Sequence, residues 1–379
     1  MEKDKTRFSP RRALFPAGYY AANAVYQGYM SLFYTDLGFG SARLGGVSAA
    51  TAAAALIAQP AWGMLGDRAK SRRRLLCALC LMAAAALPLA LLSPAFWAQM
   101  LAAAVFYAFF CALLPLGDAI LLEADGGTFG GYRLVGGASF AVSGALFGAV
   151  MGRTGSAGAI WVTAGILVLT ALAALLLPNA PGRQRRERIT MGRLLQDKNL
   201  VRLLAFVLPV QMTMGFFYTF YAPYFKALGG SGAQLGLGYL LAAVSEAPYL
   251  LLSGRIYRRF GAARPMCIAA LVLAARWLML GLAPSAGVAL ASQLLHGGGF
   301  IVMSVSMAYW IADHVSPELR ASGQGLLNMV TFGAARILGN LGGGGLAQAM
   351  GRGGAFLAGA GVCALALCIF APWAFRRKE

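Results

Sequence analysis

The chain has 379 residues, of which 59% are hydrophobic and only 12% are charged. A soluble domain normally carries about a quarter charged residues. The composition therefore excludes a cytosolic enzyme, a secreted disulfide scaffold and a disordered chain. The formal net charge of +19 does not predict nucleic-acid binding, because the basic residues form short clusters between apolar runs and never gather on one soluble domain.

Apolar runs of about 20 residues, the length that crosses a bilayer, follow one another along the chain. The first six lie at 13–37, 44–65, 75–94, 96–122, 132–151 and 157–177. After a polar stretch, the other six lie at 200–228, 234–254, 265–284, 288–311, 323–349 and 355–375. We therefore predict an all-α membrane protein with twelve transmembrane helices.

The two halves echo each other. GMLGDRAKSRRRLL begins at Gly63 after the second run, and GRIYRRFGAARPM begins at Gly254 after the eighth. Tandem halves of this kind are typical of transporters whose binding site lies at mid-membrane. We expect two pseudo-symmetric six-helix bundles, residues 1–177 and 200–379, joined by a cytoplasmic linker at 178–199.

The distribution of Lys and Arg predicts the orientation. Alternate segments outside the apolar runs carry 25 of the 32 basic residues, and the segments on the opposite side carry four. Basic loops stay on the cytoplasmic side. Both termini are therefore expected in the cytoplasm of a cell whose cytoplasmic membrane holds the protein.

Nothing in the sequence indicates an enzyme. The six cysteines all fall inside apolar runs, where packing is the expected role. We find no metal-ligand cluster, no nucleophile with a base and no phosphate-binding loop. No catalytic residue, metal site or cofactor is therefore predicted, and an ATP-driven pump is excluded.

The loop after the second run carries an ordered motif, QPAWGMLGDRAKSRRRLL, over residues 59–76. It resembles the signature of the major facilitator superfamily, G-x-x-x-D-[RK]-x-G-[RK]-[RK], although Ser71 stands where that family often has Gly. In the family this cluster latches the two halves in one conformational state. The latch residues that the resemblance implies are Gly63, Asp67, Arg68, Arg72 and Arg73.

Seven ionisable residues interrupt the apolar runs: Asp118, Glu123, Arg133, Glu246, Arg276, His296 and Arg336. A charge at the bilayer centre costs at least about 2.5–3.5 kcal/mol, so these positions are the best functional candidates. We expect most of them to pair within a central cavity. For Glu123 and Arg336 a static role in helix packing is expected instead.

Their surroundings resemble the lactose-permease-like proton symporters and their phenylpropionate and nucleoside permease relatives. The resemblance implies that Asp118 near the end of helix four pairs with Arg133 in helix five, and that both bind the substrate. It also implies substrate contacts from Glu246, Arg276 and His296, in helices eight, nine and ten.

Two departures from that branch limit the resemblance. The lactose permease has a proton-carrying glutamate three residues after the histidine, where this chain has Gly299. Helix seven also lacks the acids that would pair with a base at Arg336. Lactose specificity is therefore not expected, and proton coupling is assigned first to Glu246, with Asp118 and His296 as further candidates.

Aromatic and amide side chains supply further candidates for contacts with the substrate. They are Asn23 and Tyr26 in the first helix and Tyr218 and Tyr221 in the seventh. Such faces suit sugar rings, nucleosides and aryl acids alike, although residues at helical spacing more often serve packing.

The expected function is secondary active transport of a small polar or aromatic solute by alternating access, with protons as the coupling ion. A drug/proton antiporter, a facilitative uniporter, a membrane enzyme and a non-transporting sensor are the alternatives. The expected partners are the solute, the proton and the lipid bilayer, and the protein is expected to be a monomer.

Overall fold

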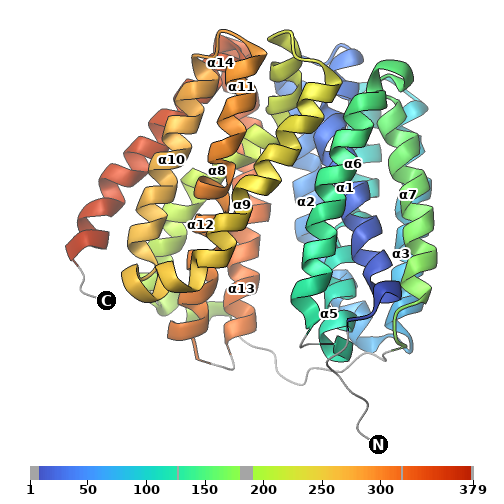
Figure 1. Cartoon of the computed structure of the whole chain (residues 1–379), viewed down its shortest axis with the longest axis horizontal. Helices are drawn as coiled ribbons and strands as arrows, with labels where there is room; N and C mark the ends of the chain where they lie inside the picture. Colours follow the sequence, from blue (N-terminus) through green and yellow to red (C-terminus); the bar gives the residue numbers. More distant parts are fainter. Residues whose placement is uncertain (1–7, 126–127, 180–190, 317–318, 377–379) are drawn as a thin grey trace, which may run out of the picture. The chain divides into compact units, whose positions relative to one another are not determined.

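The computed structural model describes residues 8–125, 128–179, 191–316 and 319–376, and every regular element within these ranges is helical (Figure 1). The predicted all-α class is therefore confirmed for the described part of the chain. Most of the predicted linker at 178–199 lies outside the described residues.

Ten helical segments of the described residues are long and apolar enough to cross a membrane. The predicted membrane class is confirmed, while the twelve-helix count and the two-bundle arrangement remain predictions. The last of the ten segments, Ser322–Phe375, is 54 residues long. Within it Gly351 has a backbone φ of 77°, a conformation that interrupts a helix and favours glycine.

Internal packing divides the chain into two compact units. Unit 1 comprises Met1–Phe39 and Ala50–Arg186, and unit 2 comprises Gly40–Ala49 and Glu187–Glu379. Gly40–Ala49 packs with unit 2 because Gly45 lies directly against the backbone of Asn340, where an added Cβ would overlap the carbonyl oxygen. The predicted division into a bundle at 1–177, a linker at 178–199 and a bundle at 200–379 remains a prediction.

Unit 1 is built around its first helix. Its elements are α1 (Pro10–Asp36), α2 (Ser41–Arg68) from Ala50 onward, α3 (Arg72–Ala86), η1 (Leu87–Leu91), α4 (Phe96–Phe110), α5 (Leu113–Asp125), α6 (Phe129–Thr154) and α7 (Gly158–Leu175). Helix α1 packs along α6 and α7 (Figure 1). Tyr29 is fully buried there and donates a hydrogen bond to the carbonyl of Gly144 at 2.6 Å.

Close approach of α1 and α6 depends on a small residue. An added Cβ at Gly136 would overlap the ring of Tyr20. Because glycine leaves that space empty, the phenol of Tyr20 can lie against α6 next to Arg133. This packing positions one of the two ionisable clusters described below.

Unit 2 is built around α8 and the long last helix. Its elements are η3 (Met191–Gln196), α8 (Lys198–Ala227), α9 (Gly232–Phe260), α10 (Ala263–Gly281), α11 (Ala286–Ala291), η4 (Ser292–Leu295), α12 (His296–His314), α13 (Arg320–Asn328), the π-helix η5 (Met329–Ala334) and α14 (Ala335–Arg376). Helices α8 and α10 pack on α14, and α9 and α10 pack on α12.

Local sequence explains where two helices of unit 2 begin. Asp197 caps α8 by accepting hydrogen bonds from the backbone amides of Asn199 and Leu200 at 2.8 and 3.3 Å. Ser231 and Gln234 form a capping box at the start of α9. In the core, Trp277 of α10 donates its indole N–H to Thr213 of α8 at 2.9 Å.

Two irregular helical turns shape the site in unit 2. The 3₁₀ turn η4 directly precedes α12 and presents Ser292 and Gln293 to α10. The π-helix η5 joins α13 to α14, and such insertions are common at functional sites.

Candidate functional site

Three ionisable side chains form a continuous chain in unit 2. Arg276 of α10 is fully buried, and one of its terminal nitrogens lies 2.9 Å from Nδ1 of His296. On the other side of the imidazole ring, Nε2 lies 3.3 Å from Oε1 of Glu246. The side chain of Glu246 is 26% exposed, against 6% for His296. The chain thus leads from a fully buried guanidinium to a carboxylate that is partly exposed.

The chemistry of Arg276 determines the proton arrangement of His296. A guanidinium only donates hydrogen bonds, so Nδ1 of the imidazole must accept and cannot carry a proton. The ring is therefore neutral with its proton on Nε2, and this N–H donates to the carboxylate of Glu246.

Arg276 is held by neutral acceptors in addition to His296. Its Nε donates to the carbonyl of Ser292 at 3.1 Å, and its second terminal nitrogen donates to the side-chain oxygen of Gln293 at 2.8 Å. The guanidinium carbon lies 4.1 Å from the ring centroid of Phe217. These contacts satisfy each guanidinium nitrogen and fix the orientation of the imidazole ring.

Aromatic rings surround His296. Phe300 stacks on the imidazole with centroids 5.6 Å apart, and Tyr218 meets it edge-on at 6.1 Å. The guanidinium of Arg336 lies 4.6 Å from the ring centroid of Tyr218. Tyr218 and Arg336 therefore belong to the same cluster as Glu246 and His296.

The other ionisable cluster lies in unit 1. Arg133 donates to the carboxylate of Asp118 at 2.5 Å and to the phenol oxygen of Tyr20 at 2.5 Å. The pairing implied by the family resemblance is thus present. The guanidinium side chain is 44% exposed and the carboxylate 15%, so the pair is accessible from one side.

The other proposed substrate contacts are less accessible. Tyr26 is buried among the rings of Phe106, Tyr107 and Phe110. Tyr221 is buried, with its hydroxyl 3.3 Å from the carbonyl of Ala289. Both environments are those of packing residues, and a substrate-binding role for either remains a prediction.

Asn23 differs from these tyrosines. Its side chain is half-buried and accepts a hydrogen bond from Gln27, one turn further along α1, at 3.0 Å. This leaves the Asn23 amide partly accessible, and its role in substrate binding also remains a prediction.

The predicted latch residues fall into two groups. Gly63, Asp67 and Arg68 are exposed near the end of α2. Arg72 is buried and makes a bidentate ion pair with Glu123 of α5, at 3.0 and 2.7 Å.

Arg73 binds the end of α7 and the chain just beyond it. It donates to the carbonyls of Leu175 and Leu177 at 3.4 and 3.3 Å. Within unit 1 these two arginines tie α3 to its neighbours, and a latch function for the whole motif remains a prediction.

Gly299, which stands where the lactose permease has its proton-carrying glutamate, lies in a closely packed part of unit 2. An added Cβ at this position would lie 2.5 Å from the side chain of Leu273 on α10. The leucine occupies the space that a larger side chain would need.

Two sets of contacts were not predicted from the sequence. One is the pair of residues that accept hydrogen bonds from Arg276, namely Ser292 and Gln293. The position of Gln293 one turn before His296 is the sequence feature that could have indicated this contact. The other joins the start of α1 to the end of α5, where Arg12 and Tyr132 both donate to the carboxylate of Asp125.

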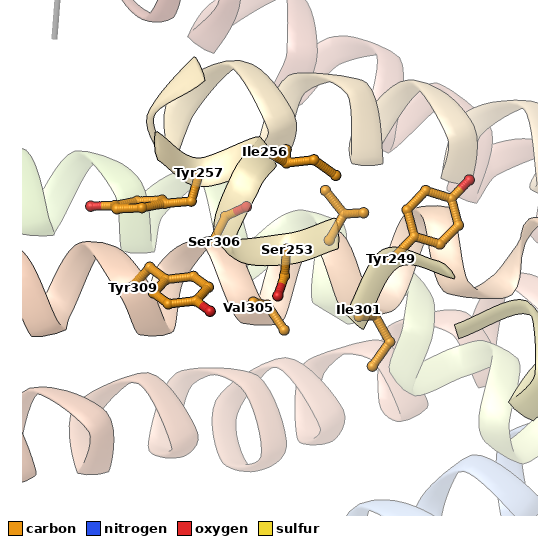
Figure 2. Close-up of a pocket in the computed structure, with 9 residues that line it drawn as sticks. Tyr249, Ser253, Ile256, Tyr257, Ile301, Val305, Ser306 and Tyr309 are labelled. Carbon is orange, nitrogen blue, oxygen red and sulfur yellow. The ribbon is translucent and has the colours of Figure 1, made fainter. Parts of the chain in front are cut away.

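The described residues of unit 2 line a small hollow and a larger one. Figure 2 shows the first, between α9 and α12, where the rings of Tyr257 and Tyr309 stack with centroids 5.0 Å apart. Its volume of about 10 Å³ is at the lower limit of what one water molecule needs. The second, lined by α8, α12, α13 and η5, has a volume of about 150 Å³. No group of three potential metal ligands occurs among the described residues.

Known proteins resemble this chain along most of its length. The family model described as the MFS_1 like family matches residues 15–358. The chain is 25% identical to the maltose permease of Geobacillus stearothermophilus over 321 residues, which cover 81% of this chain and 80% of that protein. It is 27% identical over 272 residues to the "Probable 3-phenylpropionic acid transporter" of Escherichia coli (strain K12), covering 68% and 70% of the two chains.

Solved structures show the same fold. The crystal structure of the nucleoside transporter NupG matches with a TM-score of 0.85 and 17% identity, covering 97% of this chain and 99% of that one. A bacterial homologue of the lysosomal transporter Spinster matches with a TM-score of 0.77. Since the family model spans nearly all of its membrane helices, this chain belongs to the MFS_1 like family of major facilitator transporters and is a multi-pass membrane protein.

Proposed function

We propose that this protein is a secondary transporter that moves a small polar or aromatic solute across the cytoplasmic membrane by alternating access, coupled to protons. The observation that carries the proposal is the chain from Arg276 through His296 to Glu246, inside membrane-spanning helices. Ionisable groups at such positions mark proton and solute pathways in transporters.

The geometry suggests how a proton would change the protein. Glu246 lies on α9 and His296 on α12, so their contact links two helices. A proton on the carboxylate removes its negative charge and weakens its hydrogen bond from Nε2 of His296. Because Arg276 holds Nδ1 unprotonated, the imidazole cannot compensate by taking a second proton. Protonation of Glu246 therefore loosens one defined link between helices.

The solute belongs to one of three classes. The relatives named above are a permease for maltose, a transporter of 3-phenylpropionic acid and a nucleoside transporter. Both ionisable clusters of this chain could bind hydroxyls or carboxylates through charge-assisted hydrogen bonds. We propose a sugar, nucleoside or organic acid, carried by a monomer with both termini in the cytoplasm.

The test is uptake of radiolabelled maltose, uridine and 3-phenylpropionate into proteoliposomes, with and without an inward proton gradient. The wild type should accumulate one of these solutes only with the gradient. Glu246→Gln should abolish accumulation and retain solute exchange, because exchange needs no net proton movement. Asp313→Asn, an exposed acid near the end of α12, is the matched control. Accumulation by Glu246→Gln at the wild-type level would refute the coupling assignment.

Facilitative uniport is the second candidate, and Gly299 favours it. The carboxylate that carries the proton in the lactose permease is absent here, and Leu273 fills its space. A uniporter would equilibrate the solute at the same rate with or without the gradient. A drug/proton antiporter would instead lose solute from the vesicles when the gradient points inward.

A further inference from the structure

Arg133, Arg276 and Arg336 are the arginines predicted within the membrane spans, and they differ in how fully they are bound. Arg133 has a carboxylate partner and a phenol partner, and each guanidinium nitrogen of Arg276 has an acceptor. Among the described residues, no carboxylate lies within ion-pair distance of Arg336 and no acceptor binds its N–H groups. Its contacts are with the rings of Tyr218 and Phe332, at 4.6 and 5.8 Å.

This arrangement leaves Arg336 able to bind an anion. Contacts with ring faces use the positive charge of the guanidinium but none of its five N–H donors. An arginine inside a membrane is costly unless it is paired. A planar guanidinium fits a carboxylate with two parallel hydrogen bonds. The missing partner is therefore best supplied by a solute carboxylate.

Arg336 does not itself line the cavity of about 150 Å³, but one residue of the lining is also a contact of its guanidinium. Phe332, which touches the guanidinium, lines the cavity. Phe300, which also lines it, lies 6.2 Å from the ring of Tyr218 that Arg336 covers. The cavity and the guanidinium thus share walls within unit 2.

The size of the cavity limits what it can hold. A protein cavity of about this volume binds a single benzene ring, so a disaccharide is too large. Phe300, Met303, Met307 and Phe332 provide apolar walls, and both aromatic rings and thioethers pack well against an aromatic solute.

The polar part of the lining is uncharged. It includes Gln211, Ser304 and Asn328, and the hydroxyl oxygen of Ser304 is buried without a hydrogen-bond partner among the described residues. Such groups suit a hydroxyl substituent on a ring. A neutral sugar or nucleoside would place no carboxylate on the guanidinium of Arg336.

We infer that this cavity and Arg336 form a binding site for a single-ring aromatic carboxylate, with the ring in the cavity and the carboxylate on the guanidinium. The inference rests on the proposed function in that it names the solute class. Uptake of one such anion with one proton on Glu246 would move no net charge.

Binding of three probes to the purified full-length protein, measured by isothermal titration calorimetry, tests the site. Benzoate has both the ring and the charge, benzamide keeps the ring without the charge, and acetate keeps the charge without the ring. The wild type should bind benzoate at least about tenfold more tightly than benzamide. Arg336→Gln should weaken benzoate binding by about 10- to 100-fold, the usual effect of a charge-assisted hydrogen bond, and leave benzamide binding unchanged. Arg336→Lys should bind benzoate with an affinity between those of the wild type and Arg336→Gln.

Two further variants separate the ring from the charge. Ser304→Leu places a larger side chain in the cavity and should weaken benzoate binding while leaving acetate binding unchanged. Arg255→Gln removes an exposed arginine of α9 and should bind every probe like the wild type. Thermal unfolding of each variant checks that it is folded.

The inference fails if the wild type does not bind benzoate, or if Arg336→Gln or Ser304→Leu binds it as tightly as the wild type. Tight binding of maltose or uridine without any of benzoate would also overturn it. These measurements use no proton gradient. The proposed proton-coupled transport can therefore survive a failure of the aromatic-acid site, and the site can survive a failure of coupling.

Discussion

A glutamate side chain at position 299 would overlap the side chain of Leu273. The family glutamate is absent from the sequence, and in the structure the side chain of Leu273 lies 2.5 Å from where a Cβ at Gly299 would be. Restoring the acid by a single substitution would therefore bury a charge in an occupied space. We propose the coupling role for Glu246 instead, whose carboxylate contacts His296 and is 26% exposed.

The packing at Gly299 can be measured with a methyl group. Gly299→Ala should lower the free energy of unfolding by about 1–3 kcal/mol, because an extra carbon in a filled core displaces its neighbours. Gly137→Ala is the matched control, since an added Cβ at that helical glycine meets no atom within 4 Å. Chemical denaturation in detergent micelles measures the free energy of unfolding of both variants. Equal stabilities would mean that Leu273 moves aside freely and that the position could accept a carboxylate.

Individual partners were predictable only where charge and spacing restrict the choice. The Asp118–Arg133 pair was implied by the resemblance and is present. The Glu246–His296 contact was expected in outline, while the acceptors of Arg276 were not, because a backbone carbonyl such as that of Ser292 leaves no trace in the sequence. Arg336 was assigned a packing role because its family partner is missing, and the structure shows a guanidinium with unused donors beside a cavity.

Among the helices, α3 and α5 are joined by an ion pair. Arg72 at the start of α3 has a side chain only 6% exposed, and Glu123 on α5 is 36% exposed. Both oxygens of the carboxylate bind the guanidinium. The expectation that Glu123 serves packing agrees with this geometry, in which one carboxylate neutralises a buried charge.

Removing that carboxylate should cost stability. Glu123→Gln should lower the free energy of unfolding by about 1–3 kcal/mol, less than the 3–5 kcal/mol of a fully buried pair, because water reaches Glu123. Arg74→Gln, an exposed arginine on the same helix, should have little effect. Replacing both partners, with Arg72→Met and Glu123→Leu, should destabilise less than the two single changes together. Additive losses would show that the two side chains act independently.

For the whole molecule, composition and run length were enough to predict membrane-spanning helices, because only a lipid environment accepts so many apolar side chains. The number of spans is harder to read. Within Ser322–Phe375 the backbone leaves the helical conformation at Gly351, between the apolar runs predicted at 323–349 and 355–375. The division into compact units also depends on Gly40–Ala49, which packs with unit 2. No change in composition along the chain predicts that packing.

Switching between states is a property of the whole molecule, and the family motif assigns part of it to Asp67. This carboxylate is exposed in the last turn of α2. The C-terminal end of a helix carries partial negative charge and disfavours an acid, so helix stability does not explain an aspartate there. The family resemblance predicts a conformational role for it instead.

Asp67→Asn should therefore leave stability unchanged or slightly higher and slow transport. If the carboxylate contributes about 1.4 kcal/mol to the balance between two states, turnover should fall about tenfold. The set of transported solutes should not change, because the residue lies outside both ionisable clusters. Asp313→Asn, an exposed acid in the last turn of α12, should gain similar stability without slower transport. A changed solute preference in Asp67→Asn would instead place the residue in solute binding, and equal turnover in both variants would remove the switching role.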